Sequence, residues 1–521
     1  MPDLPTITPE TVADLVDRLP RSSWIGGRWI HGRDGSDRPG ANSDTDRPGA
    51  ASGTAVSLAA EDLAVEDPAT GETLVTIAAA SDGAAAGLAA LDAAAEAQAS
   101  WAATTPRERS DILRRAFELL HARADDLALT MTLEMGKPLA EGYGEVSYGA
   151  EFLRWFSEEA VRTPGRLRPA PAAADQLMFV DSRPVGPCLL ITPWNFPLSM
   201  GTRKIGPALA AGCTVVLKPA GMTPLSSLLL VEILEEAGVP HGVVNCVVTP
   251  QSKEMSAAVM ADPRLRKVSF TGSTPVGKGL LRQAAEHVLR TSMELGGNAP
   301  FLVLPSADLD VAAEAARLAK WRNNGEACTA ANRFYVHSSV AEEFTRRLAQ
   351  VADSLVEGPG IEPESTLGPV ISAKALSEMQ ELVDDAVERG ARIVTGGEAL
   401  DRPGHFYPAT VLADVPADAR VCREEIFGPI APVVVMDDVD EMIAAANSTE
   451  FGLMSYVMAE DHREIARAVR GIASGMVAVN VGVASDPAAP FGGVKESGVG
   501  REGSHEGLAE YLETTYVRMA L

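Results

Sequence analysis

One cysteine in this chain lies in a stretch that could support nucleophilic chemistry, NNGEACTAANRF, which runs from Asn323 to Phe334. A cysteine can be an inert apolar residue or, as a thiolate, a nucleophile. Nothing within these residues decides which of the two Cys328 is. The decision depends on the groups that the rest of the chain can bring to the sulfur.

Two other motifs carry side chains that such chemistry could use. Glu294 lies in the apolar stretch SMELGGNAP, where a buried and unpaired carboxylate would keep its proton and could act as a general base. A salt-bridged structural glutamate is an equally good interpretation of that stretch. Asn195 stands between two prolines in ITPWNFP. A fixed side-chain amide is a good oxyanion donor, although a turn asparagine is the commoner use.

Two further motifs could hold a nucleotide. In FTGSTPVGKG, Gly272 and Ser273 follow a predicted strand and precede a predicted helix, whose free N–H groups could hold a pyrophosphate. Lys218 ends the apolar strand of VVLKPAG, at the edge where doubly wound sheets bind ligands. Each motif alone is weak, because glycine-serine turns and solvated lysines at strand ends are common.

The elements that must position these residues alternate along the chain. Residues 81–160 have apolar positions at helical spacing, and from VGPCLLITPW onward apolar strands alternate with helices. This pattern predicts an α/β fold with a parallel sheet covered on both faces, and a second alternating set follows over 306–480. WIGGRWIHG and LAVEDPATGETLVTIA predict strand pairs, and LAEYLETTYVRMAL predicts a terminal strand that pairs elsewhere.

Composition excludes several classes of protein. A net charge of -26 over 521 residues repels nucleic acid. The five cysteines form no CxxC pair, which argues against a disulfide framework or a structural metal site and favours a reducing compartment. The N-terminus has no signal-peptide pattern, and no apolar stretch is long enough to cross a bilayer. We therefore expect a cytoplasmic protein without nucleic-acid or membrane partners and without a metal.

Taken together, the motifs resemble the aldehyde dehydrogenase superfamily. TPWNFP, GCTVVLKPA, FTGSTPVG, MELGGNAP, GEACTAANRF, EEIFGP and PFGGVKESGVGREG occur in the family's order. The resemblance covers residues 21–521 apart from a low-complexity segment at 33–62. It implies a Rossmann-type cofactor domain, an α/β catalytic domain and a small β bridging arm, in a homodimer or homotetramer. The implied divisions are an N-terminal extension at 1–20, a cofactor domain at 21–165 and 185–296, a catalytic domain at 297–496, and an arm at 166–184 and 497–521.

The resemblance also implies roles for single residues. Cys328 would be the nucleophile, Asn195 and the Cys328 backbone N–H would hold the oxyanion, and Glu294 would activate water. The cofactor groove would be formed by Thr192, Trp194, Lys218, Ala220, Gly221, Gly272, Ser273, Leu295, Glu425 and Phe427.

Within the family, the tail APFGGVKESGVGREGSHEGLAEYLETTYV is most similar to succinate-semialdehyde dehydrogenases, which act in GABA degradation. The implied carboxylate-binding residues are Arg162, Arg322 and Ser485, and guanidinium groups suit a carboxylate. Gly221 stands where NAD-preferring members often have a glutamate that repels a 2′-phosphate. We therefore expect NADP as the preferred cofactor and NAD as the alternative.

Two residues depart from the pattern of the family, and four alternative functions remain open. Glu326 replaces a common glutamine and would raise the pKa of Cys328 if it faced the sulfur, whereas Ala330 replaces a second cysteine and predicts no disulfide switch. The rivals are a dehydrogenase for glutarate semialdehyde or a neutral aldehyde, a non-catalytic member, a phosphorylating or acyl-CoA-forming enzyme, and a cysteine hydrolase. Intact Cys328, Glu294 and Asn195 disfavour the second, Glu294 disfavours the third, and the lack of a histidine partner motif disfavours the last.

Overall fold

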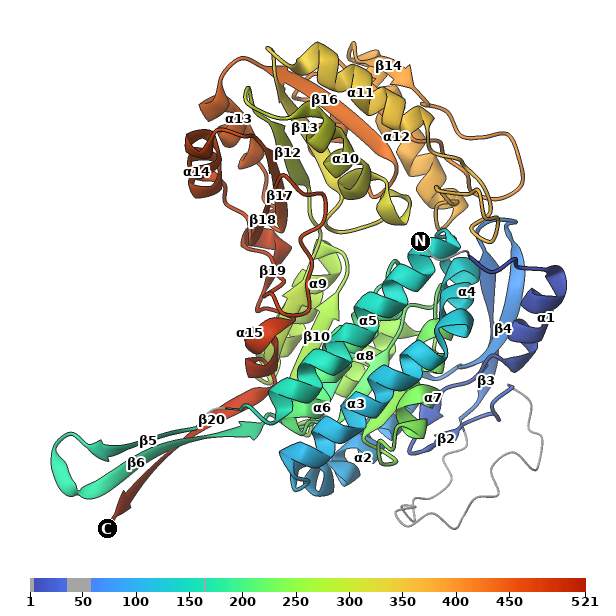
Figure 1. The fold of residues 1–521 in the computed structure, drawn as a ribbon. Coiled ribbons are helices and arrows are strands. Elements are labelled where there is room, and N and C mark those ends of the chain that lie inside the picture. The colour runs from blue at the N-terminus through green and yellow to red at the C-terminus, as the bar shows by residue number, and fades with distance from the viewer. Residues whose placement is uncertain (1–3, 35–57, 164) are drawn as a thin grey trace.

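The computed structural model describes residues 4–34, 58–163 and 165–521. The chain forms two bodies, each built on a β-sheet with helices on both faces, and a three-stranded ribbon projects from one of them (Figure 1). The α/β class expected from the alternation of strands and helices is therefore confirmed. None of the described helices is long and apolar enough to span a membrane.

The first sheet has the strand order β19-β11-β10-β7-β8-β9-β1-β2. The five strands from β11 to β9 run parallel, while β19 and β1 pair antiparallel at either side of them. WIGGRWIHG forms the expected strand pair β1–β2. The strands are β1 Trp24–Ile25, β2 Arg28–Trp29, β7 Cys188–Ile191, β8 Val215–Lys218, β9 Val244–Cys246, β10 Lys267–Thr271, β11 Arg290–Glu294 and β19 Gly498–Val499.

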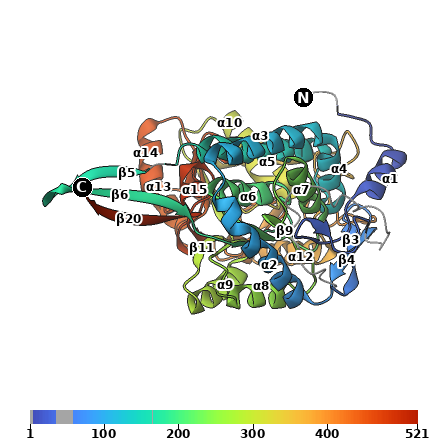
Figure 2. The same cartoon turned by 90° about the horizontal axis from the view of Figure 1, so that it is seen from below.

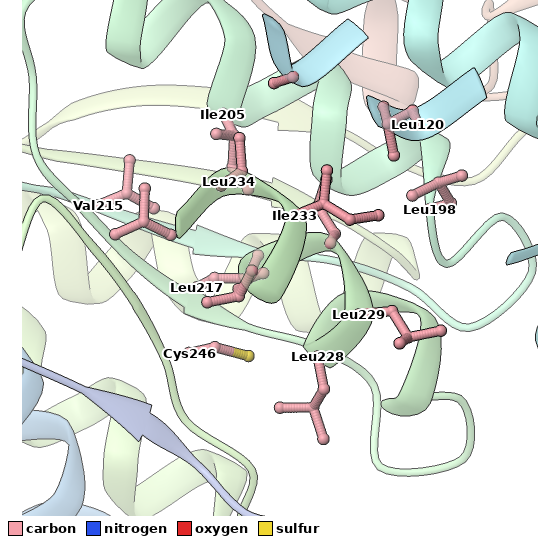
Figure 3. Packing of buried hydrophobic residues seen from close by; sticks show 14 of the residues in the cluster. Leu120, Leu198, Ile205, Val215, Leu217, Leu228, Leu229, Ile233, Leu234 and Cys246 are labelled. Atoms are coloured by element: carbon pink, nitrogen blue, oxygen red, sulfur yellow. The ribbon is translucent and has the colours of Figure 1, made fainter. Parts of the chain in front are cut away.

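Helices bury both faces of this sheet, so its strands read as continuous apolar runs. Successive residues point to opposite faces: Leu190 and Leu217 pack with α3–α7, whereas Leu189 and Val216 pack with α2, α8 and α9. Figure 3 shows side chains of α7 packed beside Leu217 of β8. The helices are α2 Gly83–Ala102, α3 Pro106–Ala122, α4 Ala124–Met135, α5 Leu139–Ala160, α6 Ser199–Ala211, α7 Leu225–Glu236, α8 Ser252–Ala261 and α9 Thr274–Glu286.

The second sheet has the order β14-β15-β16-β13-β12-β17-β18 and is parallel except at β14. Phe301 and Phe334 face α10 and α11, whereas Leu302 and Tyr335 face α12–α14. The strands are β12 Ala299–Val303, β13 Ala331–His337, β14 Arg392–Thr395, β15 Thr410–Ala413, β16 Ile430–Met436, β17 Met454–Met458 and β18 Met476–Val479. The helices are α10 Leu309–Lys320, α11 Ala341–Asp353, α12 Ala373–Glu388, α13 Val439–Ala446 and α14 His462–Gly471. Short 3-10 helices are η1 Arg322–Gly325, η2 Arg420–Cys422 and η3 Lys495–Ser497.

The projecting ribbon consists of β5 (Arg166–Ala170), β6 (Ala173–Pro184) and β20 (Leu512–Ala520). The expected terminal strand is β20, which pairs antiparallel with β6 (Figure 2). The ribbon takes fewer C-terminal residues than the expected 497–521. β19 pairs with β11 of the first sheet, and α15 (Ser504–Ala509) packs on α5 and α6.

The N-terminal region holds more regular structure than its composition suggests. Helix α1 (Pro9–Arg18) is capped by the Thr8 side chain, and it packs on α4. β3 (Ala60–Asp67) and β4 (Glu72–Ala80) form the expected hairpin. The predicted low-complexity segment 33–62 therefore overlaps the start of β3, and its residues 35–57 lie outside the described residues.

Candidate active site

The parallel strands of the first sheet end at one edge and bring the candidate residues together there. β7 ends just before the loop that carries Asn195, and β10 ends just before Gly272. Lys218 and Glu294 are the last residues of β8 and β11. This is the edge at which doubly wound sheets bind ligands.

Cys328 lies in the loop between η1 and β13 and lines two cavities. The first cavity, of about 220 Å³, lies towards the first sheet, and the second, of about 360 Å³, lies towards α5 and α10. Burial raises the pKa of the Cys328 thiol to about 12, and the carboxylates of Glu425 and Glu294 add to this while Arg203 and Arg322 oppose it. In the free protein the sulfur is therefore a thiol, and a base must remove its proton before it can attack.

The first cavity contains eight of the residues expected from the sequence: Trp194, Asn195, Gly272, Ser273, Leu295, Cys328, Glu425 and Phe427. The rings of Trp194 and Phe427 meet edge to face with their centroids 5.3 Å apart. Phe427 has a φ of +50°, which is rare for a bulky side chain and is typical of strained functional loops. Ser273 is the N-cap residue of α9, so the helix N-terminus opens onto this cavity.

Glu425 is held in place from two sides. Its carboxylate accepts a hydrogen bond of 3.1 Å from the Gly297 N–H. Burial raises its pKa to about 7, against which the charge of Lys320 acts. Lys320 is itself buried, which lowers its pKa to about 7. The two groups therefore change charge in the neutral range, at the wall of the cavity.

Four of the residues expected in the cofactor groove do not line the first cavity: Thr192, Lys218, Ala220 and Gly221. Burial lowers the pKa of Lys218 to about 8, and no ion pair within the described residues involves it. The Thr192 hydroxyl is buried without a hydrogen-bond partner in the described part of the chain. A buried cation without a counter-ion is costly, so this edge of the sheet suits an anionic ligand such as a nucleotide phosphate.

Glu294 is buried, and neither of its carboxylate oxygens has a hydrogen-bond partner among the described residues. Burial raises its pKa well above the ordinary value, and the neighbouring Glu502 adds to this. Arg203 and Lys204 oppose the shift. Of the two interpretations open from the sequence, the structure favours the unpaired carboxylate over the salt-bridged one.

A hydrogen bond connects Asn195 to Glu326, and the contacts of Glu326 show the direction of its carboxylate. The Asn195 side-chain Nδ2 donates to the Glu326 backbone carbonyl at 2.9 Å. The Glu326 carboxylate turns away and accepts a hydrogen bond of 2.9 Å from the Ile371 N–H. Glu326 is not among the charges that shift the pKa of Cys328. The raised pKa of Cys328 therefore comes from burial and from other carboxylates.

The second cavity is lined by the other face of the Cys328 loop. Arg322 and Ser485, two of the three residues predicted to bind a carboxylate, line it together with residues of α5, α6 and α10. The Arg322 guanidinium lies 5.4 Å from the Phe196 ring centroid. Its Nε is buried without a hydrogen-bond partner in the described residues. A donor in that state is available to an acceptor in the cavity.

Sequence reasoning missed Arg203, which also lines the second cavity. Arg203 pairs with Glu502 at 2.6 Å, and its guanidinium lies 4.0 Å from the Phe491 ring centroid. Burial raises the pKa of the Tyr148 hydroxyl, and Arg203 and Ser485 oppose this shift. One signal was visible: SMGTRKIGPALAAG predicts a helix with Arg203 and Lys204 in an otherwise apolar run, and such cations need a buried partner.

The prediction that Arg162 binds the substrate carboxylate is wrong for this structure, because Arg162 does not line the cavity. It lies just beyond the C-terminus of α5, with a half-exposed side chain, and pairs with Glu159 at 3.0 Å and Glu158 at 3.6 Å. The cavity is lined instead by the first half of α5, up to Tyr148. The helix runs twelve residues further to Ala160, which at 1.5 Å per residue is about 18 Å.

Comparison with known proteins was made against families, single proteins and solved structures. Residues 56–517 match the aldehyde dehydrogenase family. The succinate-semialdehyde dehydrogenase of Paenarthrobacter nicotinovorans is 57% identical over 433 residues, which are 83% of this chain and 96% of that protein. The NADP(+) succinate-semialdehyde dehydrogenase of Escherichia coli (strain K12) is 47% identical over 88% of this chain and 95% of that protein. A crystal structure of an E. coli NADP-dependent enzyme superposes with a TM-score of 0.89 at 43% identity, over 98% of this chain and 99% of the other.

Proposed function

The chain belongs to the aldehyde dehydrogenase family, and on that premise we propose that it oxidises succinate semialdehyde to succinate, with NADP as the preferred cofactor and NAD as the alternative. One observation carries the substrate assignment: Cys328 shares the second cavity with Arg203 and Arg322. A C4 semialdehyde has its reacting carbon at one end and a carboxylate at the other. Guanidinium groups bind carboxylates with two charge-assisted hydrogen bonds. The names of the two relatives given above support the same substrate.

The first chemical step belongs to Cys328 and Asn195. Once its proton is removed, the Cys328 sulfur attacks the aldehyde carbon and forms a thiohemiacetal oxyanion. The Asn195 amide has two N–H bonds, and one of them is used on the Glu326 carbonyl. The second N–H, together with the Cys328 backbone N–H, would hold the oxyanion.

The residues around the first cavity fit a dinucleotide cofactor. A bound oxidised nicotinamide would supply the hydride acceptor that turns the thiohemiacetal into a thioester. Gly272 and Ser273 at the start of α9 would hold the pyrophosphate, and Lys218 would hold the adenosine ribose or its 2′-phosphate. Glu425 and Phe427 would position the nicotinamide ribose and ring. Trp194, Leu295, Thr192 and Ala220 would complete the groove.

Glu294 would carry the second half of the reaction. Its raised pKa makes the Glu294 carboxylate a stronger base than an ordinary glutamate. As a general base it would take a proton from the water that attacks the thioester carbon, and the Cys328 thiolate would leave. This step releases the carboxylic acid and needs neither coenzyme A nor phosphate.

The preference for NADP rests on two residues near the end of β8. Lys218 carries a buried charge without a carboxylate partner in the described residues. Gly221, three residues later, supplies no carboxylate that would repel a 2′-phosphate. Specificity for a phosphorylated ribose needs both the attraction and the absence of that repulsion.

We further propose a cytoplasmic homodimer or homotetramer that acts in the degradation of γ-aminobutyrate. The ribbon projects from the body and leaves apolar side chains exposed, with Leu167 at 68% and Tyr516 at 53%. A second copy of the chain would bury them. All five cysteines lie in the described residues and carry free thiols, which suits a reducing compartment.

Initial rates test the proposal. The purified enzyme is assayed with succinate semialdehyde, glutarate semialdehyde and butyraldehyde, each with NADP and with NAD. The highest kcat/KM is expected for succinate semialdehyde with NADP. Preference for butyraldehyde would reject the carboxylate-binding site, and a strong preference for NAD would reject the cofactor assignment.

A further inference from the structure

We propose that Asn323 is a positioning residue that sets the oxyanion donor Asn195 against the loop that carries Cys328. The inference rests on the proposed function, since it assigns Asn195 as an oxyanion donor. Asn323 is 1% exposed and lines the second cavity. It lies in η1, five residues before the nucleophile.

The hydrogen bonds of the Asn323 side chain connect the two halves of the site. Its Nδ2 donates to the Asn195 backbone carbonyl at 3.0 Å and to the Glu326 backbone carbonyl at 3.0 Å. The Asn195 side chain donates to the same Glu326 carbonyl at 2.9 Å. The three residues thus form a closed set of hydrogen bonds between the β7–α6 loop and the nucleophile loop. The Glu326 carbonyl lies two residues before Cys328.

The backbone of Asn323 is held in a conformation that favours this contact. Its φ of +56° and ψ of +40° are left-handed, a region that asparagine tolerates better than most residues. Its N–H donates to the Glu141 carboxylate at 2.6 Å, and its carbonyl accepts from the Glu326 N–H at 2.9 Å. Every polar backbone group of Asn323 is therefore used to keep the side chain in place.

Lys137 fixes the Asn195 peptide from a second side. Its Nζ donates to the Asn195 carbonyl at 3.1 Å and forms a buried ion pair with Glu145. The Glu145 carboxylate in turn accepts hydrogen bonds of 3.0 Å from two backbone N–H groups at the start of α6. Removing Asn323 would therefore leave the Asn195 loop anchored to α5, but its tie to the nucleophile loop would be reduced to the bond from the Asn195 side chain to the Glu326 carbonyl.

The neighbouring Asn324 provides a matched control. It is also 1% exposed and left-handed, with a φ of +58°. Its amide bonds to Pro369 at 2.8 Å and to Gly368 at 2.7 Å. These bonds stabilise the same loop but do not reach Asn195. Loss of either amide therefore has a similar structural cost, but of the two only the loss of Asn323 loosens the oxyanion donor from the nucleophile loop.

The test is a double-mutant cycle on the full-length enzyme. Asn323→Gly and Asn324→Gly each keep the left-handed backbone and delete the amide. Both are made in the wild-type and in the Asn195→Ala background, and kcat, both KM values and Tm are measured. A displacement near 1 Å at a reacting centre costs on the order of 10²-fold, so we expect Asn323→Gly to lower kcat by about 10- to 100-fold. The KM values should stay near those of the wild type.

The background decides between positioning and general stability. In the Asn195→Ala background the donor is gone, so Asn323→Gly should lower kcat no further. Asn324→Gly should lower Tm about as much as Asn323→Gly does, and its effect on kcat should be the same in both backgrounds. An equal loss from Asn323→Gly in both backgrounds, or no loss in either, overturns the inference. Asn323→Asp, which keeps the side-chain volume and removes the donor, is the second variant should Asn323→Gly fail to fold. The cycle is run with the best aldehyde found for the wild type, so a wrong substrate assignment appears in the wild-type rates and not in the coupling.

Discussion

The substrate cavity makes its strongest prediction at Arg322. Arg322→Met removes the guanidinium and keeps a chain of similar shape. The native group lines the second cavity beside Cys328, and its Nε is buried without a hydrogen-bond partner within the described residues. It interacts electrostatically with the half-buried Glu141. Its free donor is therefore available to the carboxylate of the substrate, and the substitution removes binding rather than structure.

The magnitude follows from the hydrogen bonds that are lost. A hydrogen bond to a charged group contributes about 1.5–3 kcal/mol, and a guanidinium can give two to one carboxylate. Arg203 still faces the carboxylate in the variant, so the full sum is not lost. We take about 3–4 kcal/mol, within the range for truncating one member of a buried charge pair. This corresponds to a loss of about 10²- to 10³-fold in kcat/KM.

The assay compares succinate semialdehyde with butyraldehyde, which has the same number of carbons and no carboxylate. Arg322→Met should lose kcat/KM for the semialdehyde and keep it for butyraldehyde. Arg162→Met is the control, because its side chain is half-exposed and pairs with Glu158 and Glu159 on the surface, and it should behave as the wild type for both aldehydes. Equal losses for both aldehydes, or a loss in Arg162→Met, would refute the reasoning.

Three further predictions concern charge. Because burial raises the pKa of the Cys328 thiol to about 12, alkylation of the free enzyme by iodoacetamide should accelerate about tenfold per pH unit from about pH 7 to about pH 10, and a plateau near pH 8 would contradict this. Lys218→Met should raise KM for NADP more than for NAD. Because the pKa of Lys218 is lowered to about 8, the affinity of the wild type for NADP should fall as pH rises through 8. Fluorescence titration measures this affinity, and an affinity that does not change with pH would count against the assignment. Glu502→Gln leaves Arg203 buried without its counter-ion and should lower the free energy of unfolding in urea by about 3–5 kcal/mol. Glu496→Gln, which breaks an exposed ion pair, should lower it by under about 1 kcal/mol. Equal effects of the two variants would contradict the role given to burial.

Much of the fold could be predicted because its main sheets are buried on both faces. Strands such as β7 and β8 are continuous apolar runs between helices, so their parallel pairing follows from the pattern. The positions of Lys218 and Gly272 at strand ends follow in the same way. The helix α1 was not predicted, since ten residues with one buried side chain give a weak signal.

The rest of the site depends on tertiary contacts that linear patterns do not contain. Arg203 lies on α6 and Arg162 just beyond the C-terminus of the neighbouring α5, but only the structure shows which end of each helix faces the cavity. The orientation of Glu326 depends on a left-handed turn at Asn323 and Asn324, which no periodicity reveals. The partner of Arg203 is Glu502, about three hundred residues later, and an ion pair at that separation leaves no local signal.

The most direct test of the account is the trapping of the acyl-enzyme. Glu294→Gln keeps the shape of the side chain and removes the base that releases the acid, so the enzyme should stop after one turnover with succinate semialdehyde and NADP. Intact-protein and peptide mass spectrometry should then find one succinyl group, attached to Cys328, and none in Cys328→Ala. A succinyl group on another residue, or steady turnover of Glu294→Gln at the wild-type rate, would contradict the assigned roles of Cys328 and Glu294.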